Sequence, residues 1–373
     1  MDFKEEVFYQ GSDIESILLY LEEEGFNDLY LLAGRPIIVK VSGINRILGK
    51  RKIKSDEVQN FINHMGNDNQ LSNEIMAGSV EEWKASFEIR HDNKICRYRC
   101  SATTGRDGFG FRSIKLIVRK LDGIAPKLET LNLEPELEEA LRELKVGSMI
   151  VAGPTGSGKS TLMASLIRSR LEDPDANEVI YTFESPIEYV HEEIVQGANF
   201  YCAHEIRDMG GDLKTFADGT IASLRQAPTG ILVGEARDRA TFEAFMDLSQ
   251  TGHWAATTLH VNSVSNIPDR VLSKFESSER DDRYKQFLSV SRVWCIQRLF
   301  PRSQGGRVAI REFLILTEEM RQELGDLGLG KARERISELV NTYGQSLANG
   351  AEKAYRNGDL DETTFRLIEK GVA

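Results

Sequence analysis

Residues 149–161 read Met-Ile-Val-Ala-Gly-Pro-Thr-Gly-Ser-Gly-Lys-Ser-Thr, an apolar run that leads into a glycine-rich stretch. The stretch from Gly153 to Ser160 matches the pattern G-x-x-x-x-G-K-[ST] at every fixed position. Glycines let backbone N–H groups turn inward around phosphate, and the amino end of a following helix adds a partial positive charge. The stretch therefore predicts a strand, a phosphate-binding loop and a helix in succession.

The loop and the first turn of its helix are expected to bind ATP together with Mg²⁺. Lys159 is placed to reach the β- and γ-phosphates, and the hydroxyl of Ser160 is placed to hold the metal ion. The alternative, a glycine-rich turn without a ligand, is disfavoured because the motif is complete and has the expected context. The predicted nucleotide-binding residues are Gly153, Pro154, Thr155, Gly156, Ser157, Gly158, Lys159, Ser160 and Thr161.

Two glutamates stand at the ends of predicted strands in the same region. Glu184 closes the run 179–184, and Glu235 closes the run 230–235. Ligands lie beyond the carboxyl ends of parallel strands, so both carboxylates should face the phosphates. Hydrolysis needs one carboxylate to orient a water and another to organise Mg²⁺, so both are catalytic candidates, with Glu235 and Ser160 as the expected Mg²⁺ ligands. For either glutamate, the alternative is a strand-end charge that faces solvent.

Four further residues are candidates for the same site. His260 follows a predicted strand at its carboxyl end, where it is placed to sense the γ-phosphate. The alternative for His260 is a hydrogen-bonded structural histidine. Arg225 and Arg237 flank one of the glutamate-bearing strands, and Glu188 lies in the loop after the other.

The chain divides into four segments by its pattern. Residues 1–120 mix helical periodicity with short strand-like runs, which predicts an α+β domain. Residues 121–135 hold two prolines and a glycine and are interpreted as a linker. In residues 136–316 helices alternate with apolar runs, which predicts an α/β domain with a parallel sheet covered on both faces. Residues 317–373 are rich in charge and predict a helical carboxyl-terminal segment.

The composition is that of an ordinary globular chain, with 40% hydrophobic and 28% charged residues. The 47 Lys and Arg against 58 Asp and Glu give a net charge of −11, which argues against a dedicated nucleic-acid binder. Four cysteines are too few for a disulfide scaffold. No apolar run approaches the roughly 20 residues that cross a bilayer, and the acidic amino terminus lacks the apolar stretch of a signal peptide. We expect a cytoplasmic protein that reaches a membrane through partners.

Four segments resemble motifs of the PilT/GspE/VirB superfamily of secretion ATPases, which are hexameric motors of bacterial pili and secretion systems. Their order and spacing along the chain match the family as well as their residues do. The segments are similar to the Walker A motif at 153–161, the Asp box at 182–191, the Walker B motif with Glu in place of Asp at 232–238, and the His box at 251–260.

The resemblance implies a RecA-like P-loop core, a PAS-like amino-terminal domain, and a homo-hexamer that is recruited to membrane-bound secretion or conjugation machinery at the inner membrane. First-domain arginines of the family reach the nucleotide of a neighbouring subunit, and Arg99 and Arg119 match them. Ser185 stands where pilus-retraction members usually carry Asp. This feature is similar to the branch that contains DotB of type IVB secretion and the plasmid conjugation protein TraJ.

Two other classes of function compete with a secretion motor. A hexameric DNA translocase or helicase shares the P-loop core but normally lines its pore with Lys and Arg, which the charge of −11 disfavours. A nucleotide-binding scaffold without catalysis is disfavoured by the presence of Lys159, Glu184 and Glu235. The sequence therefore predicts a Mg²⁺-dependent ATPase that drives a type IV, and specifically type IVB, secretion or conjugation system.

Overall fold

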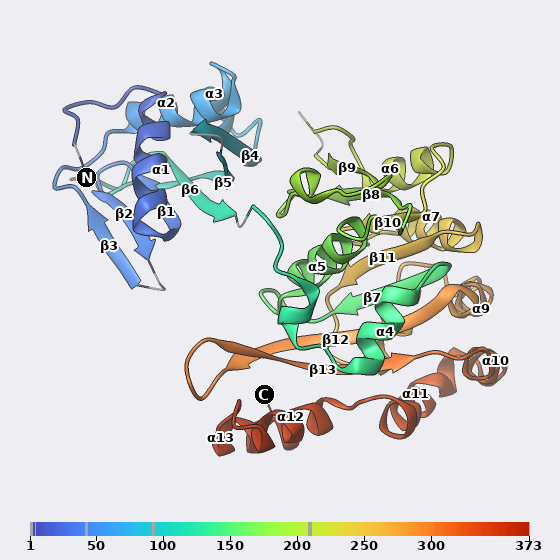
Figure 1. The fold of residues 1–373 in the computed structure, drawn as a ribbon. Helices are drawn as coiled ribbons and strands as arrows, with labels where there is room; N and C mark the ends of the chain where they lie inside the picture. Colours follow the sequence, from blue (N-terminus) through green and yellow to red (C-terminus); the bar gives the residue numbers. More distant parts are fainter. Residues whose placement is uncertain are drawn as a thin grey trace. The chain divides into compact units, whose positions relative to one another are not determined.

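The computed structural model describes residues 3, 5–41, 44–91, 94–121, 123–207 and 211–372. The chain falls into a first unit, Met1–Gly123, and a second unit, Ile124–Ala373. Each unit is built around a β-sheet of its own (Figure 1). Among the helices that the structure describes, none combines the length and the apolar character that crossing a membrane requires.

The first unit is a six-stranded antiparallel sheet with the strand order β3-β2-β1-β6-β5-β4. Its core forms between three helices and the sheet face that carries Tyr98, Cys100 and Val118, all of them buried. Alternate residues of the same strands lie on the other face, as the pleat requires. The elements are α1 (Asp13–Glu24), β1 (Phe26–Leu32), β2 (Ile37–Val41), β3 (Ile44–Leu48), α2 (Ser55–Gly66), α3 (Leu71–Ala77), β4 (Glu82–His91), β5 (Lys94–Arg106) and β6 (Arg112–Leu121).

The second unit is a seven-stranded sheet with the order β13-β12-β7-β11-β10-β8-β9 and helices on both faces (Figure 1). Its elements are a 3-10 helix (Leu128–Leu131), α4 (Pro135–Glu143), β7 (Gly147–Ala152), α5 (Lys159–Leu171), β8 (Val179–Glu184), a 3-10 helix (Glu192–Ile194), β9 (Phe200–Glu205), α6 (Phe216–Ser223), β10 (Gly230–Val233), α7 (Arg239–Gln250), β11 (Trp254–Leu259), a 3-10 helix (Val264–Asn266), α8 (Ile267–Leu272), α9 (Arg280–Val290), β12 (Ser291–Pro301), β13 (Arg307–Ile315), α10 (Glu318–Leu327), α11 (Leu329–Tyr343), α12 (Leu347–Arg356) and α13 (Glu362–Glu369).

The strand that leads into the phosphate loop is buried on both of its faces. Met149 and Val151 of β7 pack in a core with α4 and α5, whereas Ile150 and Ala152 pack in a second core with α7 to α11. This explains why the run before the glycines is continuously apolar rather than alternating. The start of the phosphate loop is therefore anchored in the centre of the sheet.

The predicted parallel arrangement is confirmed for β7, β11, β10 and β8, and β12 and β9 extend the sheet in the same sense. At one edge the sheet is not parallel. There, β13 pairs with β12 in the antiparallel sense. The connection between these strands, residues 302–306, is too short for the crossover that a parallel pair needs. The short connection alone therefore requires β12 and β13 to form an antiparallel hairpin.

The sequence pattern predicts a helix over 331–347, but in the structure this helix, α11, ends four residues earlier, and α12 begins at Leu347. Helix α11 ends at Tyr343 because Gln345 exchanges two backbone hydrogen bonds with Phe313 of β13, at 2.9 and 3.1 Å. A Cβ atom on Gly344 would lie 2.1 Å from the Phe313 carbonyl oxygen, so only glycine allows this approach. The sequence pattern also does not predict β9, α8, α9, β12, β13 or α12.

Candidate nucleotide-binding and catalytic site

The phosphate loop joins β7 to α5 and lies directly against β12. Gly153 has φ +145° and Gly158 has φ +82°, in the region that favours glycine. A Cβ atom on Gly153 would lie 2.3 Å from the backbone oxygen of Gln297. A Cβ atom on Gly158 would lie 2.9 Å from the side-chain nitrogen of the same residue. Both glycines are therefore required by backbone conformation and by this close contact.

Lys159 is only 8% exposed, and its ammonium group is held over the loop. The Nζ atom donates hydrogen bonds to the carbonyl oxygens of Gly153 and Pro154, each at 2.9 Å. Burial lowers the pKa of Lys159 from its ordinary value, and the charges of Glu235 and Glu188 partly oppose that shift. The side chain can exchange these carbonyls for phosphate oxygens without leaving the loop.

The two predicted glutamates come together because their strands are neighbours in the sheet. Glu184 ends β8, and Glu235 lies two residues beyond β10, which pairs with β8. The turn between Val233 and Glu235 is fixed by the Gly234 N–H, which donates to Phe183, and by the Thr258 hydroxyl, which donates to the Gly234 carbonyl. The carboxylate of Glu235 then lies 2.5 Å from Arg237 Nη2 and 3.7 Å from His260 Nε2.

Glu184 faces a cavity of about 30 Å³ beside the first turn of α5. Burial raises the pKa of Glu184 to about 7, opposed by a hydrogen bond from Thr182 and assisted by the charge of Glu188. Ser160 and His191 line the same cavity, whose volume suits about one water molecule. A carboxyl group at this position can therefore switch protonation state close to neutral pH.

The cavity also reveals a residue to which the sequence analysis assigned no role. His191 is buried and packs edge-on against Tyr201, with 5.1 Å between ring centroids. Burial and the charge of Arg168 lower the pKa of His191 to about 4, so the ring is neutral at physiological pH. His191 is the last residue of the 182–191 segment, so the motif already contained it. The sequence alone did not show that its side chain lies beside Glu184.

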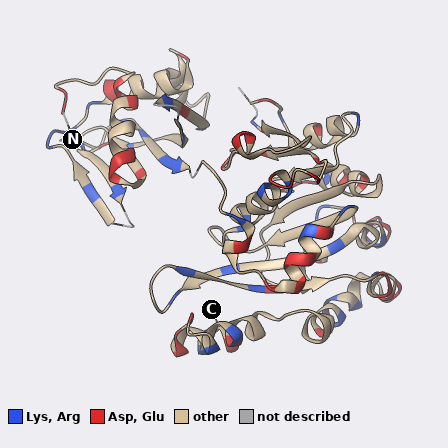
Figure 2. Cartoon of the chain, in the orientation of Figure 1, with Lys and Arg blue, Asp and Glu red and all other residues tan. Residues whose placement is uncertain are grey.

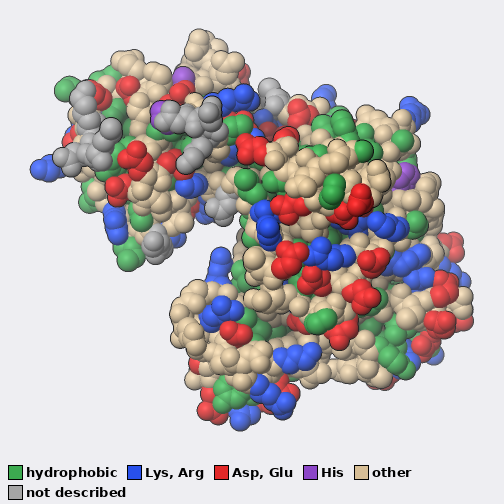
Figure 3. All heavy atoms as spheres, in the orientation of Figure 1, with side chains coloured by type: hydrophobic (Ala, Val, Ile, Leu, Met, Phe, Trp, Pro, Cys, Tyr) green, Lys and Arg blue, Asp and Glu red, His purple; other side chains and the backbone are tan. Residues whose placement is uncertain are grey.

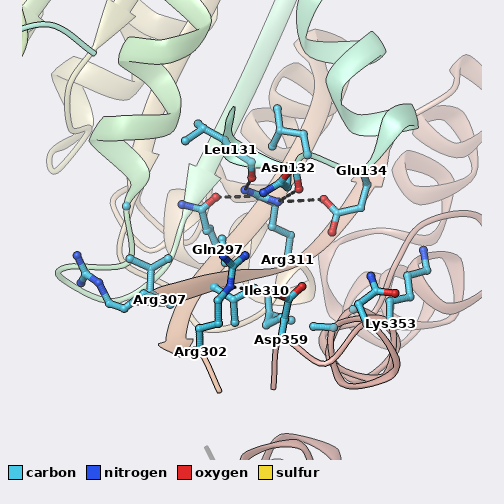
Figure 4. Close-up of a pocket in the computed structure, with 18 of the residues that line it drawn as sticks. Leu131, Asn132, Glu134, Gln297, Arg302, Arg307, Ile310, Arg311, Lys353 and Asp359 are labelled. Atoms are coloured by element: carbon cyan, nitrogen blue, oxygen red, sulfur yellow. Dashed lines mark hydrogen bonds and ion pairs between the residues drawn. The ribbon is translucent and has the colours of Figure 1, made fainter. Parts of the chain in front are cut away.

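A larger cavity of about 720 Å³ opens on the other side of the loop, bounded by β12, β13, residues 130–134 and α12 (Figure 4). Gly158 and Thr161 belong to its lining, so it is continuous with the start of α5. Leu299 and Ile310 give it an apolar wall, and Arg311, which is 2% exposed, is buried within its lining (Figure 4). A nucleotide whose phosphates occupy the loop can extend its sugar and base in this direction.

The other predicted residues fall outside this group. Arg225 is exposed just after α6, and no hydrogen bond or ion pair in the described part of the chain joins it to Lys159 or the glutamates. Arg99 and Arg119 belong to the first unit, where they lie directly opposite each other on β5 and β6. Arg119 is 59% exposed, and its Nε atom lies 2.6 Å from Asp28.

Comparison with known proteins gives the family. Residues 112–280 match the family model described as a type II/IV secretion system protein. The type IV pilus retraction ATPase PilT of Pseudomonas aeruginosa is 30% identical over 310 residues, which are 83% of this chain and 84% of that protein. The chain therefore belongs to the PilT-type family of secretion ATPases, as the four sequence motifs predict. It is an ATPase motor of this secretion and pilus family.

Two solved structures are similar over almost the whole chain. The X-ray structure of the Legionella pneumophila ATPase DotB has 31% identity and a TM-score of 0.90, and the match covers 100% of this chain and 99% of that one. The crystal structure of the pilus retraction motor PilT with bound ADP has 28% identity and a TM-score of 0.79, with 94% and 95% covered. These matches confirm the α/β fold with a RecA-like sheet, an amino-terminal antiparallel sheet and carboxyl-terminal helices.

We predict that Lys159→Ala lowers ATP hydrolysis at least about a hundredfold. The change removes a positive charge from a buried position over the loop, where an electrostatic donor has its largest effect. Steady-state phosphate release measures this, with Lys145→Ala as a control because Lys145 is an exposed lysine of the same unit. A Lys159→Ala protein that is as active as the control would contradict the role of the loop.

Glu184→Gln and Glu235→Gln keep the shape of each side chain and remove its charge. We predict that both variants bind ATP and fail to turn it over. Binding by calorimetry and single-turnover hydrolysis with radiolabelled ATP separate the two properties. Glu205→Gln is a suitable control, since Glu205 ends the edge strand β9. Normal turnover in either site variant would show that its carboxylate is not catalytic.

The raised pKa of Glu184 gives a pH dependence with a definite sign. If the ionised carboxylate orients the attacking water, kcat/KM rises with pH through about 7 and then levels off. Below the pKa it should fall about tenfold per pH unit, because the protonated form is inactive. As a control, the affinity of Glu184→Gln for ATP is measured over the same pH range. Because this variant lacks the titrating carboxyl group, any change in its affinity comes from the ionisation of ATP itself. A flat wild-type profile between pH 5.5 and 8 would be the contrary result.

Proposed function

We propose that this chain is the hexameric ATPase motor of a type IVB secretion or conjugation system. The observation that carries the proposal is the likeness to the DotB ATPase of Legionella pneumophila, which extends over 100% of the chain. That match includes the first unit and the carboxyl-terminal helices as well as the ATPase core. Ser185 in place of the Asp of the retraction branch supports the same assignment.

In the proposed site, the phosphates of ATP lie on residues 153–161 and the nucleoside extends into the 720 Å³ cavity. Ser160 and Glu235 would hold Mg²⁺, because hydroxyl and carboxylate oxygens are ligands that this ion prefers. The metal ion, when bound, neutralises charge on the phosphates. Glu184 orients a water molecule, and His260, 3.7 Å from Glu235, senses the γ-phosphate. Glu188 and Arg237 adjust the charge around Lys159 and Glu235.

Arg99 and Arg119 are proposed to complete the site of a neighbouring subunit. Both side chains leave the first unit on the sheet face opposite its core, because Tyr98, Cys100 and Val118 occupy the alternate positions. A head-to-tail ring brings such a face to the next copy at every interface. The proposed homo-hexamer is cytoplasmic and is recruited to the inner membrane by docking to the membrane-bound machinery.

A hexameric DNA translocase is the competing function. Both charge signs are distributed along the elements of each unit (Figure 2). On the face drawn in Figure 3, Lys and Arg are interspersed with Asp and Glu and form no continuous basic stripe. The electrostatic footprint of nucleic-acid binding is therefore lacking on that face. Stimulation of the ATPase by single-stranded DNA would favour the competing function.

We predict that mixing two inactive variants restores activity. Lys159→Ala inactivates the phosphate loop, and Arg99→Ala removes an arginine that acts in trans. Mixed rings contain interfaces with one intact loop and one intact arginine, so ATP hydrolysis should return in part. Light scattering and crosslinking of two tagged variants establish that the rings are hexameric and mixed. An active wild-type monomer, or mixed rings without activity, would refute the trans arrangement.

A further inference from the structure

The phosphate loop is tied to β12 by a side chain that lies outside all four sequence motifs. Gln297 is 3% exposed, and its Nε2 atom donates to the carbonyl oxygen of Ser157 at 2.8 Å. Its Oε1 atom accepts a hydrogen bond from Arg311 Nε, also at 2.8 Å. One amide group therefore joins the loop to a buried arginine on β13.

Arg311 carries this connection to the chain segment that precedes α4. It is 2% exposed, and its Nη1 atom donates to the Asn132 carbonyl at 3.1 Å and to Glu134 at 3.3 Å. Its Nη2 atom donates to the Leu131 carbonyl at 3.0 Å. Figure 4 shows the guanidinium group between Gln297 on one side and these acceptors on the other.

Packing of Leu128, Leu131 and Leu133 in the core holds the segment that receives these bonds, and Arg311 binds carbonyl groups at its end. The 3-10 helix Leu128–Leu131 ends at Asn132, which has the left-handed φ of +47°. Carbonyls at the carboxyl end of a helix have no partner within the helix, so they need donors from elsewhere. Arg311 supplies donors to two of them.

The carboxyl-terminal segment joins the same network. Gln345 Nε2 donates to Glu134 at 2.7 Å and to the Arg311 carbonyl at 3.0 Å. Lys353 of α12 donates to Gln345 Oε1 at 2.8 Å. The loop, the hairpin, residues 131–134 and α12 are therefore joined by continuous hydrogen bonds, and all four line the 720 Å³ cavity.

Burial of a charged arginine has a large desolvation cost in free energy, which an apolar side chain of similar size would not have. Desolvation of a charged pair can exceed its attraction, and packed apolar residues of similar volume are often as stable. What the guanidinium group provides instead is fixed geometry, because its planar donors act in set directions. In Arg311, Nε binds Gln297, which in turn binds the phosphate loop. The two Nη atoms bind the carbonyl groups of Leu131 and Asn132 in the opposite wall of the cavity.

We propose that Gln297 and Arg311 are positioning residues that set the separation between the phosphate loop and the 131–134 wall, and so determine nucleotide affinity. The proposal rests on the proposed function, in which the nucleotide spans from the loop into the cavity. Neither side chain is required to touch the reacting phosphate. The effect therefore falls on binding and on KM rather than on kcat.

The test compares the full-length variants Arg311→Lys and Gln297→Met with wild type. Each should raise KM for ATP and the Kd for ADP at least fivefold and leave kcat within about twofold. Inorganic pyrophosphate, which occupies the loop without reaching the wall, should compete equally well against wild type and Arg311→Lys. Arg321→Lys is the matched control, because Arg321 is a buried arginine that also donates to two carbonyls, those of Ser291 and Leu316.

The control should lose thermal stability as the test variants do and keep the wild-type KM. An unchanged KM in a folded Gln297→Met, or an equal rise in KM in Arg321→Lys, would overturn the proposal. So would an equal loss of pyrophosphate and ADP affinity in Arg311→Lys. If Arg311→Lys does not fold, Gln297→Met decides the question alone. Failure of the proposed nucleotide site is distinguishable, because Lys159→Ala would then bind ADP as tightly as wild type does.

Discussion

The phosphate loop packs so closely against β12 that Gly153 and Gly158 cannot carry side chains, and the rest of the site depends on that contact. A Cβ atom at position 153 would collide with the Gln297 backbone, and positive φ favours glycine at both 153 and 158, while β12 pairs with β7 beside the loop. The same neighbour relation orders the sheet and brings the carboxyl ends of β8 and β10 to the loop's other side. The conformation of the loop and the order of the strands around it therefore depend on each other.

The side chains around the loop carry more negative than positive charge, so an anionic nucleotide binds there most favourably together with a cation. Lys159 is surrounded by the negative charges of Glu235 and Glu188, and Glu184 lies close to Glu188. ATP adds further negative charge, so binding at this place is favoured by a divalent cation, which is the largest local charge in such sites. Lys159 is buried and the three glutamates are partly buried, so their interactions are screened less than those between fully exposed charges.

The fold was largely predictable because the strongest patterns coincide with the centre of the sheet. The run before Gly153 and the alternation that follows it give β7, α5, β8, β10 and β11 with small errors at their ends. The placement of Glu184 and Glu235 at the ends of neighbouring strands followed from strand polarity alone, and their catalytic roles stay predictions. The Gln297–Arg311 connection did not, since a glutamine and an arginine in a strand resemble surface residues. The acceptors of Arg311, at 131 and 132, are separated from it by about 180 positions of sequence.

Two arginines of the first unit face each other on the side of its sheet opposite the core. Arg99 and Arg119 are directly opposite each other on adjacent antiparallel strands, where like charges destabilise the pair. Asp28 offsets this in part by pairing with Arg119, and the face concerned is the one turned away from the buried aromatic and aliphatic side chains. An anionic group bound between the two arginines would reduce their repulsion further, because each guanidinium group would then face an opposite charge.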